Sequence, residues 1–182
     1  MILKKNAEYI FTISNFWDAT ECEKLISKSE TIGFSRATVN TEIGPRFLET
    51  VRNNDRVIYT DHLLADTIWE KLKELSPKKF GKSTAIGLNE QFRFYKYLPG
   101  QTFKKHRDQS FIRNEVEASY FTLMIYLNDN FLGGETTFNS ISIKPCTGTA
   151  LIFEHGLEHE GTKVDEGVKY VLRTDIMFRC ED

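Results

Sequence analysis

The chain has 182 residues, of which 40% are hydrophobic and 27% are charged, and its formal net charge is −2. This length is enough for one domain with its own core, and the composition is that of a globular protein rather than a disordered one. With no excess of basic residues we expect no nucleic-acid partner, and no apolar run reaches the roughly 18 residues of a membrane span.

The cysteines and the first residues indicate the compartment. Cys22, Cys146 and Cys180 are odd in number and widely spaced, so they form neither a zinc spacing nor a disulfide framework, and we expect reduced thiols. No apolar segment typical of a signal peptide follows Met1–Lys5. We therefore expect a cytoplasmic protein, with a monomer as the default state.

Two helices are expected in the first half of the chain. The first spans Trp17–Glu30, with Ser14 or Asn15 as its N-cap and Gly33 as its stop signal. The second spans Asp61–Leu75, where leucine and isoleucine recur at the period of a helix. Both apolar stripes are expected to pack against a sheet.

A long connection, Thr38–Arg56, separates the two predicted helices. It contains Gly44-Pro45 and a polar run that ends at Arg56. Connections of this length in a compact domain are often lids or binding loops. A solvated hairpin or a disordered loop is the other interpretation of the same residues.

From Asn89 onward, short β-prone segments alternate with turns rich in Gly, Pro, Asn and Asp. They are Phe92–Tyr97, Ala118–Asn128, Glu135–Phe138, Ile141–Lys144, Thr149–Glu154 and Lys169–Arg179. Many short strands of this kind are typical of a barrel or a jelly roll. We predict one α+β, mainly β domain over 1–182, with helical support in 1–88 and the β core in 89–182.

Three residues are candidate metal ligands: His106 and Asp108, two positions apart, and the distant His159. Residues two apart on a strand face the same way, and His159 follows an apolar strand that could lie beside the first. Two imidazoles and one carboxylate make the facial triad of non-haem Fe(II) oxygenases, which leaves coordination positions open. A His-x-Asp pair taken alone can also be a surface ion pair.

Lys169 begins the last predicted strand and shares a face with Val171, Arg173 and Asp175. A lysine inside a barrel is costly unless an anion pairs with it. A diacid co-substrate would supply that anion, and the hydroxyl of Tyr97 could donate to the same carboxylate.

Several blocks in this part of the chain resemble the prolyl 4-hydroxylases. They are Phe94–Gln101 followed by Phe103 and His106-x-Asp108, Thr122–Asn128, Gly133–Phe138, the Pro145 to Phe153 segment, His159 with Gly161, and Gly167-x-Lys169-Tyr170. The resemblance covers roughly 91–178, and the blocks agree in order and spacing. It implies the fold of the 2-oxoglutarate/Fe(II) dioxygenases, a double-stranded β-helix (jelly roll) with flanking helices.

The resemblance also implies cofactors and residue roles. Fe(II) would be held by the three candidate ligands, with 2-oxoglutarate and O₂ as co-substrates and ascorbate as a further expectation. The distal carboxylate of 2-oxoglutarate would be held by Lys169 and Tyr97, with Arg173 and Tyr95 as their rivals. Two further residues, Ile125 and Thr136, either line this pocket or pack in the core.

The substrate is the open part of this prediction. Many prolyl hydroxylases carry a tryptophan on the last strand, where this chain has Arg173 and Asp175. Hydroxylation of a prolyl residue in a protein or peptide, giving succinate and CO₂, is the first hypothesis. Oxidation of a free amino acid or other small molecule is the second, with Arg52, Arg56 and Arg113 beside Arg173 as candidate carboxylate clamps. A non-catalytic binding module with the same fold is a third.

Overall fold

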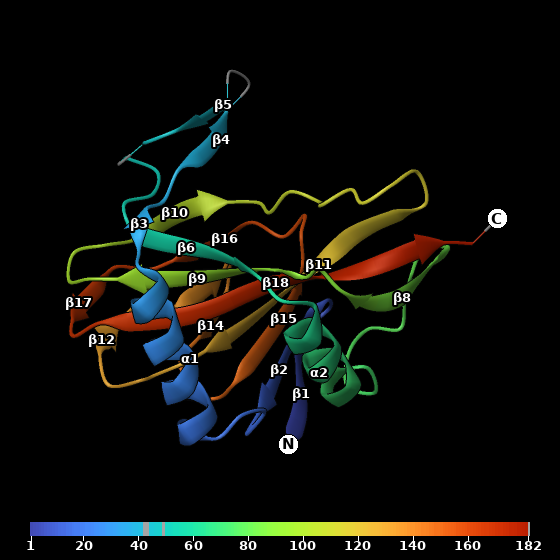
Figure 1. Ribbon diagram of the computed structural model, residues 1–182, viewed down its shortest axis with the longest axis horizontal. Coiled ribbons are helices and arrows are strands. Elements are labelled where there is room, and N and C mark those ends of the chain that lie inside the picture. The colour runs from blue at the N-terminus through green and yellow to red at the C-terminus, as the bar shows by residue number, and fades with distance from the viewer. Residues whose placement is uncertain (42–43, 49, 182) are drawn as a thin grey trace.

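Two β-sheets face each other, and two helices cover the outer side of the larger sheet (Figure 1). This arrangement is seen in a computed structural model, which describes residues 1–41, 44–48 and 50–181. One hydrophobic cluster lies between the larger sheet and the helices, and a second lies between the two sheets. The mainly β, jelly-roll prediction is confirmed.

The larger sheet has ten strands among the described residues, all paired antiparallel. Its main path is β1 (Ile2–Ala7), β2 (Ile10–Ser14), β15 (Ala150–Glu154), β11 (Glu117–Tyr126), β18 (Lys169–Cys180), β9 (Gln91–Tyr97), β6 (Asp55–Thr60) and β3 (Ser35–Arg36). At one end of β18, β8 (Ser83–Leu88) pairs with it and carries β7 (Lys79–Phe80).

The smaller sheet contains four strands. They are β10 (Phe103–His106), β16 (His159–Gly161), β13 (Thr136–Phe138) and β14 (Ile141–Ile143). Two separate pairs complete the structure: β12 (Leu132–Gly133) with β17 (Val164–Glu166), and the hairpin of β4 (Val39–Thr41) and β5 (Gly44–Arg46).

Helices α1 (Ala19–Ile32) and α2 (His62–Leu72) each begin after an aspartate. The side chain of Asp18 accepts from the Glu21 amide, and Glu21 accepts from the Asp18 amide, which forms a capping box. The predicted N-caps Ser14 and Asn15 were therefore wrong, and the predicted stop at Gly33 is confirmed. Among the described helices, none combines the length and the apolar character of a bilayer span.

The first half of the chain is not only helical support. Strand β2 pairs with β15, and β6 pairs with β9, so both belong to the same sheet as the C-terminal strands. The predicted division at 88/89 therefore does not divide the sheet. The connection Thr38–Arg56 contains the hairpin β4–β5, which projects from the body of the molecule (Figure 1), while residues 42, 43 and 49 lie outside the described part.

Alternation along the central strands determines which side chains face the space between the sheets. On β11, Leu123 and Ile125 belong to the cluster beneath the helices, while Met124 and Tyr126 belong to the cluster between the sheets. Lys169 has the same parity on β18 as Val171, which also lies between the sheets. The polar face of β18 is therefore directed at the smaller sheet.

Candidate functional site

The three predicted metal ligands come together at the edge of the smaller sheet. His106 ends β10 and His159 begins β16, and these two residues are paired across the strands. Asp108 lies just beyond β10, where its amide donates to the His155 carbonyl at 3.1 Å. One ligand atom from each of the three residues lies within 4.8 Å of the others. The spacing is that of donors arranged around a single ion.

Backbone carbonyls orient both imidazoles. The Nδ1 atom of His106 lies 2.7 Å from the Lys104 carbonyl, and that of His159 lies 3.0 Å from the Leu157 carbonyl. A carbonyl can only accept, so each Nδ1 carries the proton and each Nε2 is left with a free lone pair. Both Nε2 atoms face Asp108, at 3.6 and 3.8 Å from its carboxylate oxygens. This is the tautomer that a metal ligand needs.

The charges at the triad favour the states that bind a cation. Burial lowers the pKa of His159 to about 4, so its imidazole is neutral near pH 7. Burial would raise the pKa of Asp108, but Arg173 and the two histidines hold it well below its usual range. The carboxylate is therefore ionised and the histidine is free to donate its lone pair.

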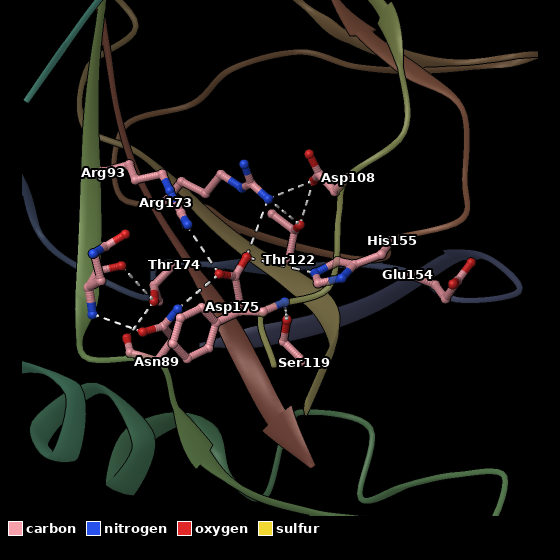
Figure 2. Close-up of polar contacts among 12 residues, drawn as sticks. Asn89, Arg93, Asp108, Ser119, Thr122, Glu154, His155, Arg173, Thr174 and Asp175 are labelled. Atoms are coloured by element: carbon pink, nitrogen blue, oxygen red, sulfur yellow. Dashed lines mark hydrogen bonds and ion pairs between the residues drawn. The ribbon is translucent and has the colours of Figure 1, made fainter. Parts of the chain in front are cut away.

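Two polar side chains hold the Oδ2 atom of Asp108. Thr122 on β11 donates its hydroxyl to this oxygen at 2.6 Å, and Arg173 on β18 forms an ion pair with it at 3.1 Å (Figure 2). The other oxygen, Oδ1, is the one nearer to His106. Because Oδ2 is already bound, the carboxylate is oriented to offer Oδ1 to an ion.

Arg173 is itself positioned by a buried carboxylate, Asp175 (Figure 2). The Oδ1 atom of Asp175 lies 3.3 Å from Arg173, and its Oδ2 atom accepts from Arg93 at 3.1 Å and from Asn89 at 3.2 Å. His155 contributes a ring nitrogen 3.7 Å from Oδ1. The ion pair with Asp175 thus holds Arg173 in the position from which it contacts Asp108.

Lys169 lies in an inner cavity beside the triad. Its side chain is 3% exposed, and its ammonium donates to the Gly134 carbonyl at 2.7 Å. No described carboxylate lies within ion-pair distance of it, and burial lowers its pKa to about 7 although Glu135 opposes the shift. Tyr97, its partner on β9, places its ring 5.1 Å from the ammonium. A buried cation without a carboxylate partner is a suitable anchor for an anionic ligand.

The inner cavity has a volume of about 40 Å³ and contains most of the predicted co-substrate residues. Its walls are formed by Tyr95, Tyr97, Phe103, His106, Asp108, Met124, Thr136, Phe153, His159, Gly161, Lys169, Val171 and Arg173. Ile125 is not among them, because its side chain points to the opposite face of β11 and packs beneath the helices. Met124, one residue earlier, takes the place that the sequence analysis gave to Ile125.

An outer cleft of about 310 Å³ lies on the other side of the triad and shares Tyr95, Phe103, His106, Asp108 and Arg173 with the inner cavity. Its remaining walls are Thr38, Val51, Arg52, Arg56, Arg93, Arg107 and Gln109. The structure therefore brings two of the three predicted substrate arginines to the site. Arg113 is elsewhere, in ion pairs with Glu90 and Glu117.

The chain was compared with known proteins. Residues 92–174 match the model of the 2OG-Fe(II) oxygenase superfamily. A putative prolyl 4-hydroxylase of Acanthamoeba polyphaga mimivirus is 25% identical over 156 residues, which cover 79% of this chain but only 59% of that relative.

Solved prolyl hydroxylases share the fold. The viral collagen prolyl hydroxylase of Paramecium Bursaria Chlorella virus-1, solved with 2-oxoglutarate, has a TM-score of 0.66 at 23% identity, over 93% of this chain and 96% of that one. A Trichoplax adhaerens prolyl hydroxylase bound to a peptide fragment of hypoxia inducible factor has a TM-score of 0.72 at 17% identity, over 94% and 84%. Likenesses at this identity establish the jelly-roll fold.

The matched family model implies Fe(II), 2-oxoglutarate and O₂, and the donor set fits them. Two imidazoles and one ionised carboxylate suit Fe(II), and the buried Lys169 ammonium suits the far carboxylate of a dicarboxylic acid. The cavity therefore brings together three side chains that could hold a metal ion and a buried lysine beside them.

Several residues of the oxygenase site were missed by sequence reasoning. Thr122 and Met124 on β11 could have been found from the phase of that strand, since they alternate with the apolar Leu123. Arg93 and Arg107 carried no signal, because they reach the cleft through the pairing of distant segments.

Proposed function

We propose that this protein is an Fe(II)- and 2-oxoglutarate-dependent dioxygenase that hydroxylates an unactivated C–H bond of a prolyl residue in a protein or peptide, with formation of succinate and CO₂. The observation that carries the proposal is the buried ammonium of Lys169, which has no carboxylate partner among the described residues, in the cavity that also contains the His106, Asp108 and His159 triad. Metal binding alone would not need that ammonium.

The residues of the site would have separate roles in this function. The triad would hold Fe(II) on one side, which leaves the remaining positions open to a chelating acid and to O₂. Bound iron with 2-oxoglutarate and O₂ supplies the oxidising power for C–H hydroxylation. Lys169 and Tyr97 would bind and orient the far carboxylate of 2-oxoglutarate, and Thr122 with Arg173 would keep the Asp108 carboxylate in place.

The choice of a peptide substrate is supported by the relatives. The curated relative is described as a putative prolyl 4-hydroxylase, and the Trichoplax structure contains a peptide fragment. The outer cleft, with its volume of about 310 Å³ beside the triad, has room for part of a peptide. Oxidation of a free amino acid is the competing proposal for the same cleft.

Succinate release tests the proposal. Protein with Fe(II), 2-oxoglutarate and O₂ is incubated with proline-containing peptides, with free amino acids, and with no addition, and the peptides are weighed by mass spectrometry. We expect peptide-stimulated succinate and a peptide that gains one oxygen atom on proline. Stimulation by free amino acids alone would establish the competing substrate class. If no addition raises succinate above the basal rate, prolyl hydroxylation is wrong.

A further inference from the structure

The outer cleft has more positive charge than the metal site requires. Five arginines line the cleft: Arg52, Arg56, Arg93, Arg107 and Arg173. Two carboxylates, those of Asp108 and Asp175, form ion pairs with Arg93 and Arg173 and neutralise part of this charge. Among the described residues, this leaves three positive charges without a compensating carboxylate. Bound Fe(II) and 2-oxoglutarate carry opposite charges of equal size and do not change the excess.

Three of the arginines, Arg52, Arg56 and Arg107, form no ion pair with any described residue, and of these three only Arg107 is exposed. Arg52 bonds to the amide oxygen of Asn54 at 2.6 Å, and Arg56 bonds to the hydroxyl of Thr38 at 3.2 Å. These partners are neutral. Arg93 and Arg173, in contrast, are held by Asp175. Arg52 and Arg56 are therefore the positions where an added anion gains most.

Arg52 is also buried and held in one orientation. It is 5% exposed, and its guanidinium carbon lies 4.3 Å from the ring centroids of both Tyr95 and Phe103. Its Nη2 atom has no hydrogen-bond partner among the described residues. A buried guanidinium with an unused donor is costly in the empty protein, and a carboxylate accepts the two parallel bonds that a fixed guanidinium offers.

The stack that holds Arg52 continues to the metal ligand. Phe103 also stacks on the His106 imidazole, with ring centroids 3.5 Å apart and planes tilted by 13°. The backbones of Arg52 and Phe103 form an isolated antiparallel β-bridge. The buried guanidinium is thus one aromatic ring away from the iron ligand, close enough for one small molecule or side chain to span the two.

The field of the arginines extends to neighbouring side chains. Burial lowers the pKa of Arg56, Tyr95 opposes this shift, and the charges of Arg52, Arg93 and Arg173 lower the pKa further. Burial would raise the pKa of Tyr95, but the same three arginines lower it to about 8. Both shifts indicate a positive potential in the cleft that an anionic ligand would neutralise.

We propose that the substrate of this enzyme presents a carboxylate to Arg52 and Arg56 while its reacting C–H group lies at the triad. The inference rests on the proposed function and adds the chemistry of the substrate: an aspartate or glutamate side chain next to the target proline, or the carboxylate of a small acid. Because a fixed guanidinium binds a carboxylate through two directed hydrogen bonds, we expect a substrate without the carboxylate to bind much more weakly.

Binding under anaerobic conditions tests this inference without turnover. Protein with Fe(II) and saturating 2-oxoglutarate is titrated by calorimetry with peptides that differ only beside the proline, which is followed by Glu, Gln or Lys. Free proline and its amide form a second pair. We expect either the Glu peptide to bind at least tenfold more tightly than the Gln peptide, or free proline to bind at least tenfold more tightly than its amide. The pair that shows this difference identifies the source of the carboxylate.

Variants locate the binding site. Arg56→Gln and Arg52→Gln are expected to remove the advantage of the acid, and Arg179→Gln to keep it, because Arg179 lies on β18 away from the cleft in an ion pair with Glu117. Arg56 is less buried than Arg52, so it remains informative if Arg52→Gln does not fold. Circular dichroism and Fe(II) affinity serve as folding controls.

The outcomes separate the two proposals. Equal binding of acid and neutral partner in both pairs overturns the carboxylate inference, even if proline peptides stimulate succinate release. An acid preference that survives both arginine substitutions overturns the location. An acid preference without any stimulated succinate release would support the cleft as a carboxylate site and contradict the hydroxylase function.

Discussion

At the scale of single residues, Lys169 lies in an environment that disfavours its charged form. Burial lowers its pKa from 10.5 to about 7. Between these values the unfolded chain binds one more proton than the folded protein, so the free energy of unfolding must rise with pH. Lys169, which would bind an anion, therefore also lowers the free energy of unfolding of the ligand-free protein at low pH.

Lys169→Met should remove this dependence. For the metal-free protein we expect the free energy of unfolding to rise between pH 7 and pH 9 by up to about 1.4 kcal/mol per pH unit. The variant should lack this part of the slope and should also lose 2-oxoglutarate affinity. Urea unfolding at three pH values measures it, with the exposed Lys163→Met as control. Equal slopes in wild type and Lys169→Met would show that the lysine is not buried in this way.

Thr122 supports the metal ligand through a single hydroxyl. Thr122→Val keeps the shape of the side chain but removes the 2.6 Å hydrogen bond to Asp108. We expect Fe(II) affinity to fall about 10-fold or more, as for other residues that orient ligands. Anaerobic metal titration measures the effect. Thr174→Val is the matched control, since this hydroxyl bonds to the Asn89 carbonyl rather than to a metal ligand, and equal losses in both variants would refute the role.

The site residues that could be predicted from sequence were polar or charged side chains at positions where a strand would otherwise carry apolar ones. The two histidines and Asp108 have a spacing that places donors on one side of a strand pair, and Lys169 is a charge on a strand with apolar neighbours. Arg52 was predicted only as a candidate carboxylate clamp, and its burial could not be predicted in the same way. Its position depends on Tyr95 and Phe103, which only the folded chain brings to either side of it.

At the scale of elements, the loop before β15 fixes the start of the helical layer. The Gly148 carbonyl accepts from the Phe16 and Trp17 amides at 3.0 and 3.1 Å. Gly148 has a φ of +72°, and a Cβ at this position would meet the Trp17 carbonyl oxygen at 1.9 Å. The chain entering α1 is thus tied to β15, the strand that also carries Phe153 to the metal site.

Gly148→Ala should therefore be far more harmful than an ordinary glycine substitution. We expect a loss of about 3 kcal/mol or more in the free energy of unfolding, because backbone strain and a backbone clash add. Gly81→Ala is the control, with a φ of +58° but no atom within 4 Å, and should cost about 1 kcal/mol. Urea denaturation compares them, and similar losses would show that the close approach to Trp17 does not exist.

Strands were predicted correctly where the polarity pattern and a turn signal agreed. They were missed where the strand forms only through pairing with distant segments. Strand β9 ends at a Pro-Gly turn as expected. Strands β1 and β2 were not predicted, because their residues are mixed in polarity and become sheet only by pairing with each other and with β15. The N-cap of α1 was misplaced because Ser14, Asn15 and Asp18 are all capable caps and only the geometry selects one.

At the scale of the whole molecule, the central strands join the two hydrophobic clusters. Strands β11, β15 and β18 supply Leu123, Ile152 and Leu172 to the helix-side cluster and Met124, Leu151 and Val171 to the cluster between the sheets. The helical layer cannot come away without exposing one face of the strands that carry the site. The fold of the described residues should therefore be lost in one step.

Unfolding by urea should accordingly be a single transition. The two tryptophans, Trp17 and Trp69, both pack on the helix side, so their fluorescence reports that layer. Far-ultraviolet circular dichroism reports the strands as well. We expect equal midpoints from both probes. A fluorescence transition at clearly lower urea than the circular dichroism transition would mean that the helical layer unfolds independently of the sheets.

The central claim is that one cavity holds Fe(II) on His106, Asp108 and His159 and 2-oxoglutarate on Lys169. Visible absorption under anaerobic conditions tests it most directly, as Fe(II) and then 2-oxoglutarate are added to the metal-free protein. We expect a weak new band only when both are present, no band in His159→Ala, and a band that needs more 2-oxoglutarate in Lys169→Ala. A wild-type protein that binds Fe(II) but develops no band with 2-oxoglutarate would contradict the account.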